Sequence, residues 1–113
     1  MEPKGIHVTV DGRSKFPDLL DDPLTLERIL RKCCEESKAT VLSVTFHKFD
    51  PQGVTMIALL SESHASLHTY PEHKSIMADF FTCGDCDARK AAMSFCWELG
   101  LENAKVKVTE RKV

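Results

Sequence analysis

The stretch from Thr40 to Leu60, with the sequence TVLSVTFHKFDPQGVTMIALL, decides the fold expected of this chain. Residues 40–49 are rich in β-branched side chains and predict a strand. Asp50-Pro51-Gln52-Gly53 is a run of turn-forming residues and predicts a hairpin. The return strand, residues 54–60, is apolar on both faces toward its end, which favours a buried position in the centre of a sheet.

Upstream of this hairpin the sequence predicts one strand and one helix. Residues 5–10 alternate in the manner of a strand, and Asp11-Gly12 then marks a turn, followed by an irregular segment to Leu20. Asp22-Pro23 is an N-cap with proline at the first helical position, so an amphipathic helix is expected over 23–37. Its apolar face includes Cys33 and Cys34, which we expect to be buried apolar groups without chemistry.

Downstream the pattern predicts a strand, a helix and a final strand. Residues 75–81 alternate as a strand, and Asp85 or Asp87 can cap a helix that ends at Gly100. Residues 104–109 give the last strand. The whole chain is therefore expected to be an α+β two-layer sandwich, a mostly antiparallel sheet with two helices on one face. No third helix is left for the other face, so we expect a second copy to cover it in a homodimer.

Length and composition exclude several classes of protein. The 113 residues suit one domain with a real core. Lys and Arg number 15 against 17 Asp and Glu, whereas a nucleic-acid binder would carry a basic excess. The apolar runs are too short to span a membrane, and Met1-Glu2-Pro3-Lys4 has no signal-peptide core. Five cysteines, an odd number, indicate reduced thiols and a cytoplasmic location.

Reactive side chains gather directly after the hairpin, between Leu60 and Glu72. This stretch holds serines, histidines and carboxylates, and a second cluster follows in Phe81-Thr82-Cys83-Gly84-Asp85. The Ser63 hydroxyl could attack the carbonyl of Glu62 and turn the peptide bond into an ester. That step needs backbone strain or stabilisation of an oxyanion. By itself the string Ser-Glu-Ser-His is a weak signal.

The wider pattern resembles the signature of the small prokaryotic S-adenosylmethionine decarboxylases, a pyruvoyl-dependent family. The segments that carry the resemblance are Ser61-Glu62-Ser63-His64, His68-Thr69-Tyr70-Pro71-Glu72, Phe81-Thr82-Cys83-Gly84-Asp85, Phe49-Asp50-Pro51-Gln52-Gly53-Val54 and Gly5-Ile6-His7. The resemblance implies cleavage between Glu62 and Ser63 into chains 1–62 and 63–113, with Ser63 converted to a pyruvoyl group. It also implies that His68 is the processing base and Cys83 the catalytic proton donor.

A pyruvoyl group supplies a ketone, which no ordinary side chain has. The ketone forms a Schiff base with the amine of an amino-acid-type substrate and accepts the electrons released on decarboxylation. The resemblance implies S-adenosylmethionine as substrate, a product used in spermidine synthesis, and a dimeric α+β sandwich. Substrate contacts are expected from Phe49, Tyr70, Glu72 and His64, with the two rings stacking on adenine or facing the sulfonium.

Two departures from the family pattern leave the substrate open. Tyr70 stands where the family usually has tryptophan, and Gly53-Val54-Thr55 stands where it usually has Gly-x-Ser. Arginine and ornithine are the alternative substrates.

The histidines and cysteines of the chain also allow functions of other classes. His64, His68, Cys83 and Cys86 could form a four-ligand zinc site in a non-catalytic binding module, although their spacing is not standard. Cys83 and Cys86 also have the spacing of a redox dithiol. Their position before the second helix does not strengthen a redox interpretation. An unprocessed regulator is a third possibility, against which the intact Ser63, His68 and Cys83 argue. His7, His47 and His73 are expected to be surface or structural residues.

Overall fold

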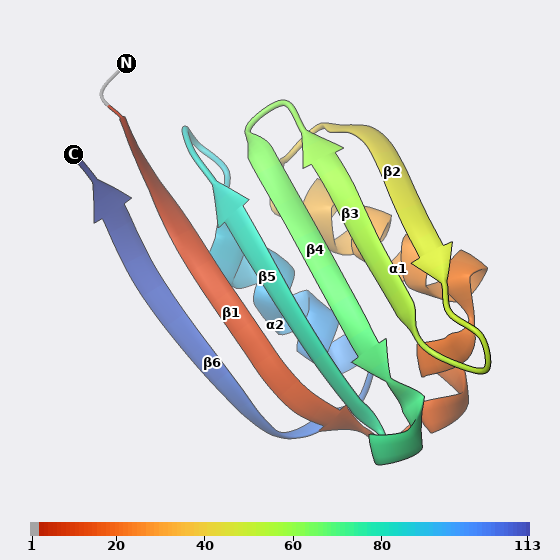
Figure 1. Cartoon of the computed structure of the whole chain (residues 1–113). Helices are drawn as coiled ribbons and strands as arrows, with labels where there is room; N and C mark the ends of the chain where they lie inside the picture. Colours follow the sequence, from red (N-terminus) through yellow and green to blue (C-terminus); the bar gives the residue numbers. More distant parts are fainter. Residues whose placement is uncertain (1–2) are drawn as a thin grey trace.

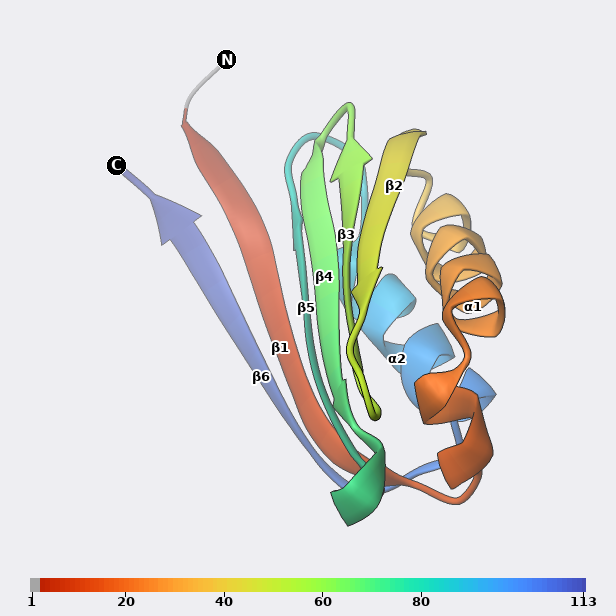
Figure 2. The same cartoon turned by 45° about the vertical axis from the view of Figure 1, so that its right-hand side comes forward.

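The computed structural model describes residues 3–113 as a six-stranded antiparallel sheet with two helices on one face (Figures 1 and 2). The strands are β1 (Lys4–Ser14), β2 (Val41–Lys48), β3 (Val54–Leu60), β4 (Ser63–Tyr70), β5 (Ser75–Thr82) and β6 (Leu101–Lys112). The helices are α1 (Pro23–Glu36) and α2 (Ala88–Glu98), with short 3-10 helices η1 (Pro17–Asp21) and η2 (Pro71–His73). The strand order is β2-β3-β4-β5-β1-β6, and every neighbouring pair is antiparallel.

The expected α+β two-layer sandwich is confirmed, and two local predictions are wrong. Asp11-Gly12 is not a turn, because both residues continue β1 and a register shift beside them bends the strand against β6. The sequence analysis predicts no strand over residues 63–70, but these residues form β4, so the sheet has six strands and not five.

The helices begin and end where the sequence predicts. The carboxylate of Asp22 accepts a hydrogen bond from the Thr25 backbone N–H at the start of α1. Asp87, rather than Asp85, caps α2 by accepting from the Arg89 N–H. Gly100 follows α2 with a φ of +57°, a left-handed conformation that glycine adopts without steric cost.

One apolar core fills the space between the sheet and the helices. Its largest members, all with less than 2% of their surface exposed, are Phe80, Phe95, Leu20, Leu26, Leu30, Met56, Leu67, Ile76 and Leu99. Phe80 of β5 meets Phe95 of α2 edge to face, with the ring centroids 5.4 Å apart. Cys33 and Cys34 are buried in this core as predicted, and burial raises the pKa of their thiols to about 11 and about 12.

In the part of the chain that the structure describes, both helices cover the same face of the sheet and leave the opposite face open (Figure 2). Ile57, Leu59 and Met77 lie on this face with 52%, 53% and 52% of their surface exposed. Residues 54–60 form an interior strand with a neighbour on each side, as expected, and in the single chain their side chains on the open face are exposed. The same open face carries His7 of β1 and His64 and His68 of β4. Among residues 3–113, no helix is long and apolar enough to cross a membrane.

Candidate active site

The bond between Glu62 and Ser63 lies at the tight turn that joins β3 to β4. Leu60 and Ser63 are paired across this turn, so only Ser61 and Glu62 form the loop. The turn is tied to Thr40 at two points. Thr40 donates its N–H to a Glu62 carboxylate oxygen at 3.0 Å, and its carbonyl accepts from the Ser61 N–H at 3.0 Å. The chain on the amino side of the bond is thus held in place.

Ser63 has an unusual backbone conformation. Its φ is +132°, a backbone conformation that residues other than glycine rarely adopt. Such a conformation costs on the order of 1–3 kcal/mol. The strain is located at the residue whose hydroxyl is expected to attack its own peptide bond. Flanking pairs with Leu60 on β3 and Thr82 on β5 hold Ser63 in this conformation.

The carbonyl of Glu62 is held by Cys83. The Cys83 backbone N–H donates to this oxygen at 3.1 Å, and the Cys83 thiol lies 3.4 Å from the same atom. Two donors aimed at one carbonyl oxygen stabilise the negative charge that develops when a nucleophile adds to the carbon. Cys83 therefore lies beside the bond at which cleavage is expected.

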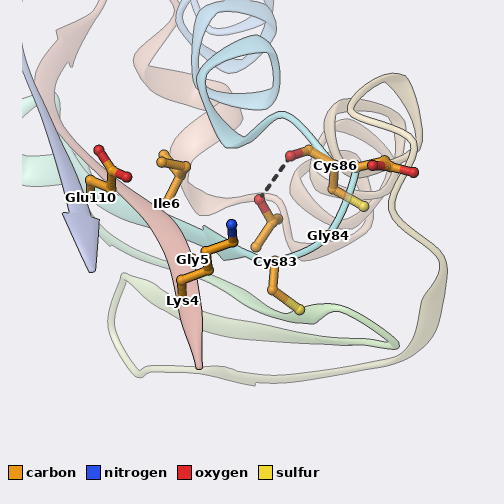
Figure 3. Close-up of a pocket in the computed structure, with 9 residues that line it drawn as sticks. Lys4, Gly5, Ile6, Cys83, Gly84, Cys86 and Glu110 are labelled. Carbon is orange, nitrogen blue, oxygen red and sulfur yellow. Dashed lines mark hydrogen bonds between the residues drawn. The ribbon is translucent and has the colours of Figure 1, made fainter. Parts of the chain in front are cut away.

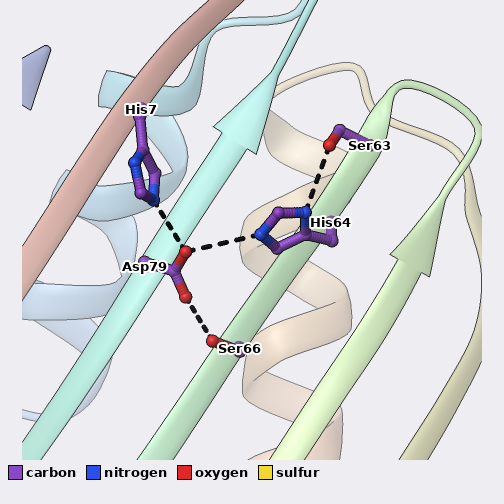
Figure 4. Close-up of polar contacts among 5 residues, drawn as sticks. All are labelled: His7, Ser63, His64, Ser66 and Asp79. Carbon is purple, nitrogen blue, oxygen red and sulfur yellow. Dashed lines mark hydrogen bonds and ion pairs between the residues drawn. The ribbon is translucent and has the colours of Figure 1, made fainter.

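A polar network runs across β4, β5 and β1 from Ser63 (Figure 4). Ser63 Oγ lies 3.2 Å from Nδ1 of His64, whose Nε2 lies 3.5 Å from Oδ2 of Asp79. His7 Nε2 lies 2.7 Å from the same oxygen, Asp79 Oδ2. The other carboxylate oxygen, Oδ1, accepts a hydrogen bond from the Ser66 hydroxyl. The five side chains join the expected cleavage point to the middle of the open face.

His68 belongs to a second cluster, near the other end of β4. Its Nδ1 lies 2.5 Å from the hydroxyl of Thr55, the residue opposite it on β3. The ring meets Tyr70 at 4.5 Å and Phe49 at 5.9 Å between centroids, both edge to face. Phe49 reaches this position because its N–H bonds to the Gly53 carbonyl at 2.8 Å and closes the β2–β3 hairpin. Glu72 follows in η2 and is exposed.

The two clusters do not meet within one chain. Ser63 and His68 are five residues apart on the same strand, a separation of roughly 16 Å at about 3.3 Å per residue. The expected site residues thus divide into two groups. Glu62, Ser63, His64 and Cys83 lie at one end of β4, whereas Phe49, His68, Tyr70 and Glu72 lie at the other.

Cavities adjoin both clusters. A pocket of about 370 Å³ lies beside Cys83 between the N-terminal end of β1 and the β5–α2 loop, with Gly5, Ile6, Cys86 and Glu110 in its wall (Figure 3). A second, more open hollow of about 450 Å³ includes Thr55, Ser66, His68 and Asp79 on the open face. This second hollow extends from the His68 cluster to the carboxylate of the polar network.

The four residues of the zinc hypothesis do not converge. His64 and His68 are four residues apart on β4, roughly 13 Å along the strand. The Cys83 thiol points to the Glu62 carbonyl and the Cys86 thiol to the Lys38 carbonyl. Burial raises the pKa of the Cys86 thiol, which disfavours the thiolate that a metal requires. Within residues 3–113 no group of three or more potential ligands is close enough to hold a metal ion.

Several site residues were missed by sequence reasoning. Asp79 and Ser66 were not singled out, and Thr55 was noted only as a hydroxyl-bearing substitute. His7 was assigned to the surface or to a structural role, yet it contacts Asp79. One available signal was the charge at Asp79 in an otherwise apolar strand, Ile76–Phe81, on the same side as Met77 and Phe81. His47 and His73 are exposed, as expected.

Comparison with known proteins identifies the family. A family model described as S-adenosylmethionine decarboxylase matches residues 6–112. A proenzyme of that name from Carboxydothermus hydrogenoformans is 37% identical over 114 aligned positions, covering 100% of this chain and 90% of the relative. One from Hydrogenobaculum is 38% identical, covering 80% of this chain and 68% of the relative, and one from Bacillus anthracis is 48% identical, covering 71% and 65%.

Solved structures agree with the fold. The crystal structure of the adenosylmethionine decarboxylase from Aquifex aeolicus superposes with a TM-score of 0.89 at 28% identity, covering 100% of this chain and 94% of that one. A Trypanosoma brucei AdoMetDC monomer, 17% identical, has a TM-score of 0.63 over 93% of this chain and 45% of its own, and shows the fold alone. The fold and the residue pattern are those of a decarboxylase proenzyme. The chain belongs to the S-adenosylmethionine decarboxylase family.

Proposed function

We propose that this chain is an S-adenosylmethionine decarboxylase proenzyme that cleaves itself between Glu62 and Ser63. The observation that carries the proposal is the pair of features at that bond. Ser63 is strained at a φ of +132°, and the Glu62 carbonyl oxygen is held by the N–H and thiol of Cys83. The first raises the energy of the intact chain, and the second lowers the energy of the tetrahedral species.

Processing uses the chain's own residues. The Ser63 hydroxyl attacks the Glu62 carbonyl carbon, and the peptide bond becomes an ester. Removal of the Ser63 Cα proton then expels the Glu62 carboxylate and leaves a dehydroalanine. Addition of water and loss of ammonia leave a pyruvoyl group at the start of chain 63–113, with chain 1–62 ending at Glu62. When present, this group supplies a ketone that captures an amine and accepts electrons on decarboxylation.

Cys83 suits the role of proton donor to the product. Its thiol lies 3.4 Å from the oxygen of the bond that is cut, and it adjoins the 370 Å³ pocket. A thiol at this position can deliver a proton beside the new ketone without moving far. The role requires a reduced cysteine, so the proposal includes a cytoplasmic, reducing location.

The second cluster suits recognition of S-adenosylmethionine. Phe49 and Tyr70 present aromatic rings at the surface, which can stack on adenine or face a sulfonium cation. Glu72 adds a carboxylate next to Tyr70, and His64 adds a polar contact near Ser63. The product would be the aminopropyl donor for spermidine synthesis.

We further propose that the working enzyme is a homodimer joined through the open sheet face. His68 lies roughly 16 Å along β4 from Ser63, too far to remove the Ser63 Cα proton in its own chain. Both clusters lie on the open face, next to the exposed Ile57, Leu59 and Met77. A second copy packed on that face would bury these apolar groups and bring His68 of the partner subunit toward Ser63.

Denaturing mass spectrometry tests the cleavage. Purified protein is expected to give two fragments, 1–62 and 63–113, the second without a free amine and reactive with hydroxylamine or borohydride at its ketone. Ser63→Ala is expected to stay at full length. A wild-type chain that remains intact after prolonged incubation would contradict the proposal. Carbon dioxide release from S-adenosylmethionine, arginine and ornithine, measured side by side, tests the substrate.

A further inference from the structure

We propose that His64, whose imidazole lies beside the Asp79 carboxylate, is the general base that starts self-cleavage by taking the proton of the Ser63 hydroxyl. The inference rests on the proposed cleavage at Glu62–Ser63 and assigns a residue to its first step. His68 is then left for the later step, removal of the Ser63 Cα proton. The two steps thus use different histidines.

The geometry is that of a nucleophile, a base and an orienting carboxylate. Ser63 Oγ is 3.2 Å from His64 Nδ1, and His64 Nε2 is 3.5 Å from Asp79 Oδ2 (Figure 4). A carboxylate on the Nε2 side favours the tautomer that carries its hydrogen on Nε2. The lone pair on Nδ1 then faces the serine hydroxyl, which is the arrangement a general base requires.

The contact between Ser63 and His64 is not a trivial result of their adjacency. In a regular strand, neighbouring side chains point to opposite faces of the sheet and do not touch. The φ of +132° at Ser63 departs from the regular strand and turns its hydroxyl toward the open face, where His64 lies. The same strained residue therefore places the nucleophile against its base.

Asp79 is itself fixed, so it can orient the imidazole. Its second oxygen accepts from Ser66, and His7 of β1 lies 2.7 Å from the oxygen that faces His64. From β6, the guanidinium of Arg111 lies 4.9 Å from the centre of the Phe81 ring. That ring meets the His64 ring at 5.8 Å. The network spans three strands, which keeps its members in register.

The proposed step is balanced and needs no other reactant. A bond forms between Ser63 Oγ and the Glu62 carbonyl carbon while the hydroxyl proton moves to His64 Nδ1. The bond between that carbon and the Ser63 nitrogen then breaks, and His64 returns the proton to the nitrogen. His64 ends the step neutral, and Asp79 stabilises the imidazolium in between. The backbone N–H of Cys83 holds the carbonyl oxygen throughout.

The experiment follows cleavage during cell-free synthesis of the full chain and uses hydroxylamine to detect the ester. Hydroxylamine at neutral pH cleaves an ester but not a peptide bond. We expect His64→Ala to slow the appearance of fragments by about 10²–10⁴-fold and to accumulate a full-length chain that hydroxylamine does not cut. His68→Ala is expected to accumulate a full-length chain that hydroxylamine does cut, since it stops after the ester.

Three further variants keep the test decisive. His73→Ala, which removes an exposed histidine in η2, is the matched control and should cleave at the normal rate. Asp79→Asn should stall at the hydroxylamine-resistant stage with an unchanged melting temperature, because an amide can hold the wrong tautomer of His64. His64→Gln replaces the alanine variant if the latter melts early. Because each readout is the stage of arrest, a purely structural role would not reproduce it.

Two results would overturn the inference. One is normal cleavage in both His64 variants, and the other is arrest of His64→Ala as a hydroxylamine-sensitive ester. In either case the wild-type chain still splits, so the proposed function stands. A wild-type chain that never splits would instead remove the proposed function.

Discussion

Ser63 combines three properties that matter only together. Its backbone is strained, its hydroxyl faces His64, and the carbonyl before it is held by Cys83. A serine with any one of these would be an ordinary turn residue. The combination lowers the barrier to an attack that an unstrained, solvated peptide bond resists.

The proposal gives Cys83 two separable functions, one for its backbone N–H and one for its thiol. Cys83→Ala keeps the N–H that holds the Glu62 carbonyl, so we expect the chain to be cleaved. Decarboxylation should fall by about 10²–10⁴-fold, because the proton donor is missing. Mass spectrometry measures the cleavage and carbon dioxide release measures the turnover.

The matched control for this variant is Cys86→Ala. Its thiol lies in the same pocket wall but points to the Lys38 carbonyl, so both cleavage and turnover should be retained. Undiminished turnover by Cys83→Ala would assign proton donation to another group.

Among the elements, β4 was the hardest to recognise. Ala65, Leu67 and Thr69 are buried against the helices, while His64, Ser66 and His68 alternate with them on the open face. This is the period-two pattern of a half-buried strand. The sequence analysis treats these polar residues as reactive groups and does not recognise the strand that they belong to. The side chains of the candidate site on β4 therefore project from a strand that is paired on both sides.

The contact between α2 and β5 supplies a stability prediction. Phe95→Ala removes a fully buried ring that packs on Phe80, and we expect the free energy of unfolding to fall by about 3–5 kcal/mol. Trp97→Ala is the control on the same helix, because Trp97 is 84% exposed and its loss should change stability by less than about 0.5 kcal/mol. Urea unfolding of cleavage-defective Ser63→Ala protein measures both. Equal losses would mean that α2 packs on the sheet differently.

At the scale of the whole molecule, the single chain holds two separated halves of a site. Ser63 and His68 lie far apart along β4, and the hydroxyl of one and the imidazole of the other are both on the open face. Under the proposed dimer, the two halves are completed when two copies meet through the open face. A dimer of the 12.7 kDa chain is therefore expected in analytical ultracentrifugation.

Mixing two inactive variants tests whether His68 acts on the other chain. Ser63→Ala supplies His68 but no cleavage point, and His68→Ala supplies the cleavage point but no base. Co-expressed with different tags, they should form mixed dimers in which the His68→Ala chain is cleaved. If co-purified mixed dimers leave that chain intact, His68 does not act across the interface.

Local periodicity, capping residues and a long, specific motif were enough to predict the two-layer fold, the helix ends and the family. Asp22, Asp87 and Gly100 mark helix ends, which depend only on residues close by in the sequence. Only the folded structure reveals the contacts of Asp79 and Thr55. The same is true of the backbone strain at Ser63 and of the distance between Ser63 and His68. Strand register brings Asp79 to His64 and Thr55 to His68 across positions distant in the chain, and no local pattern contains that register.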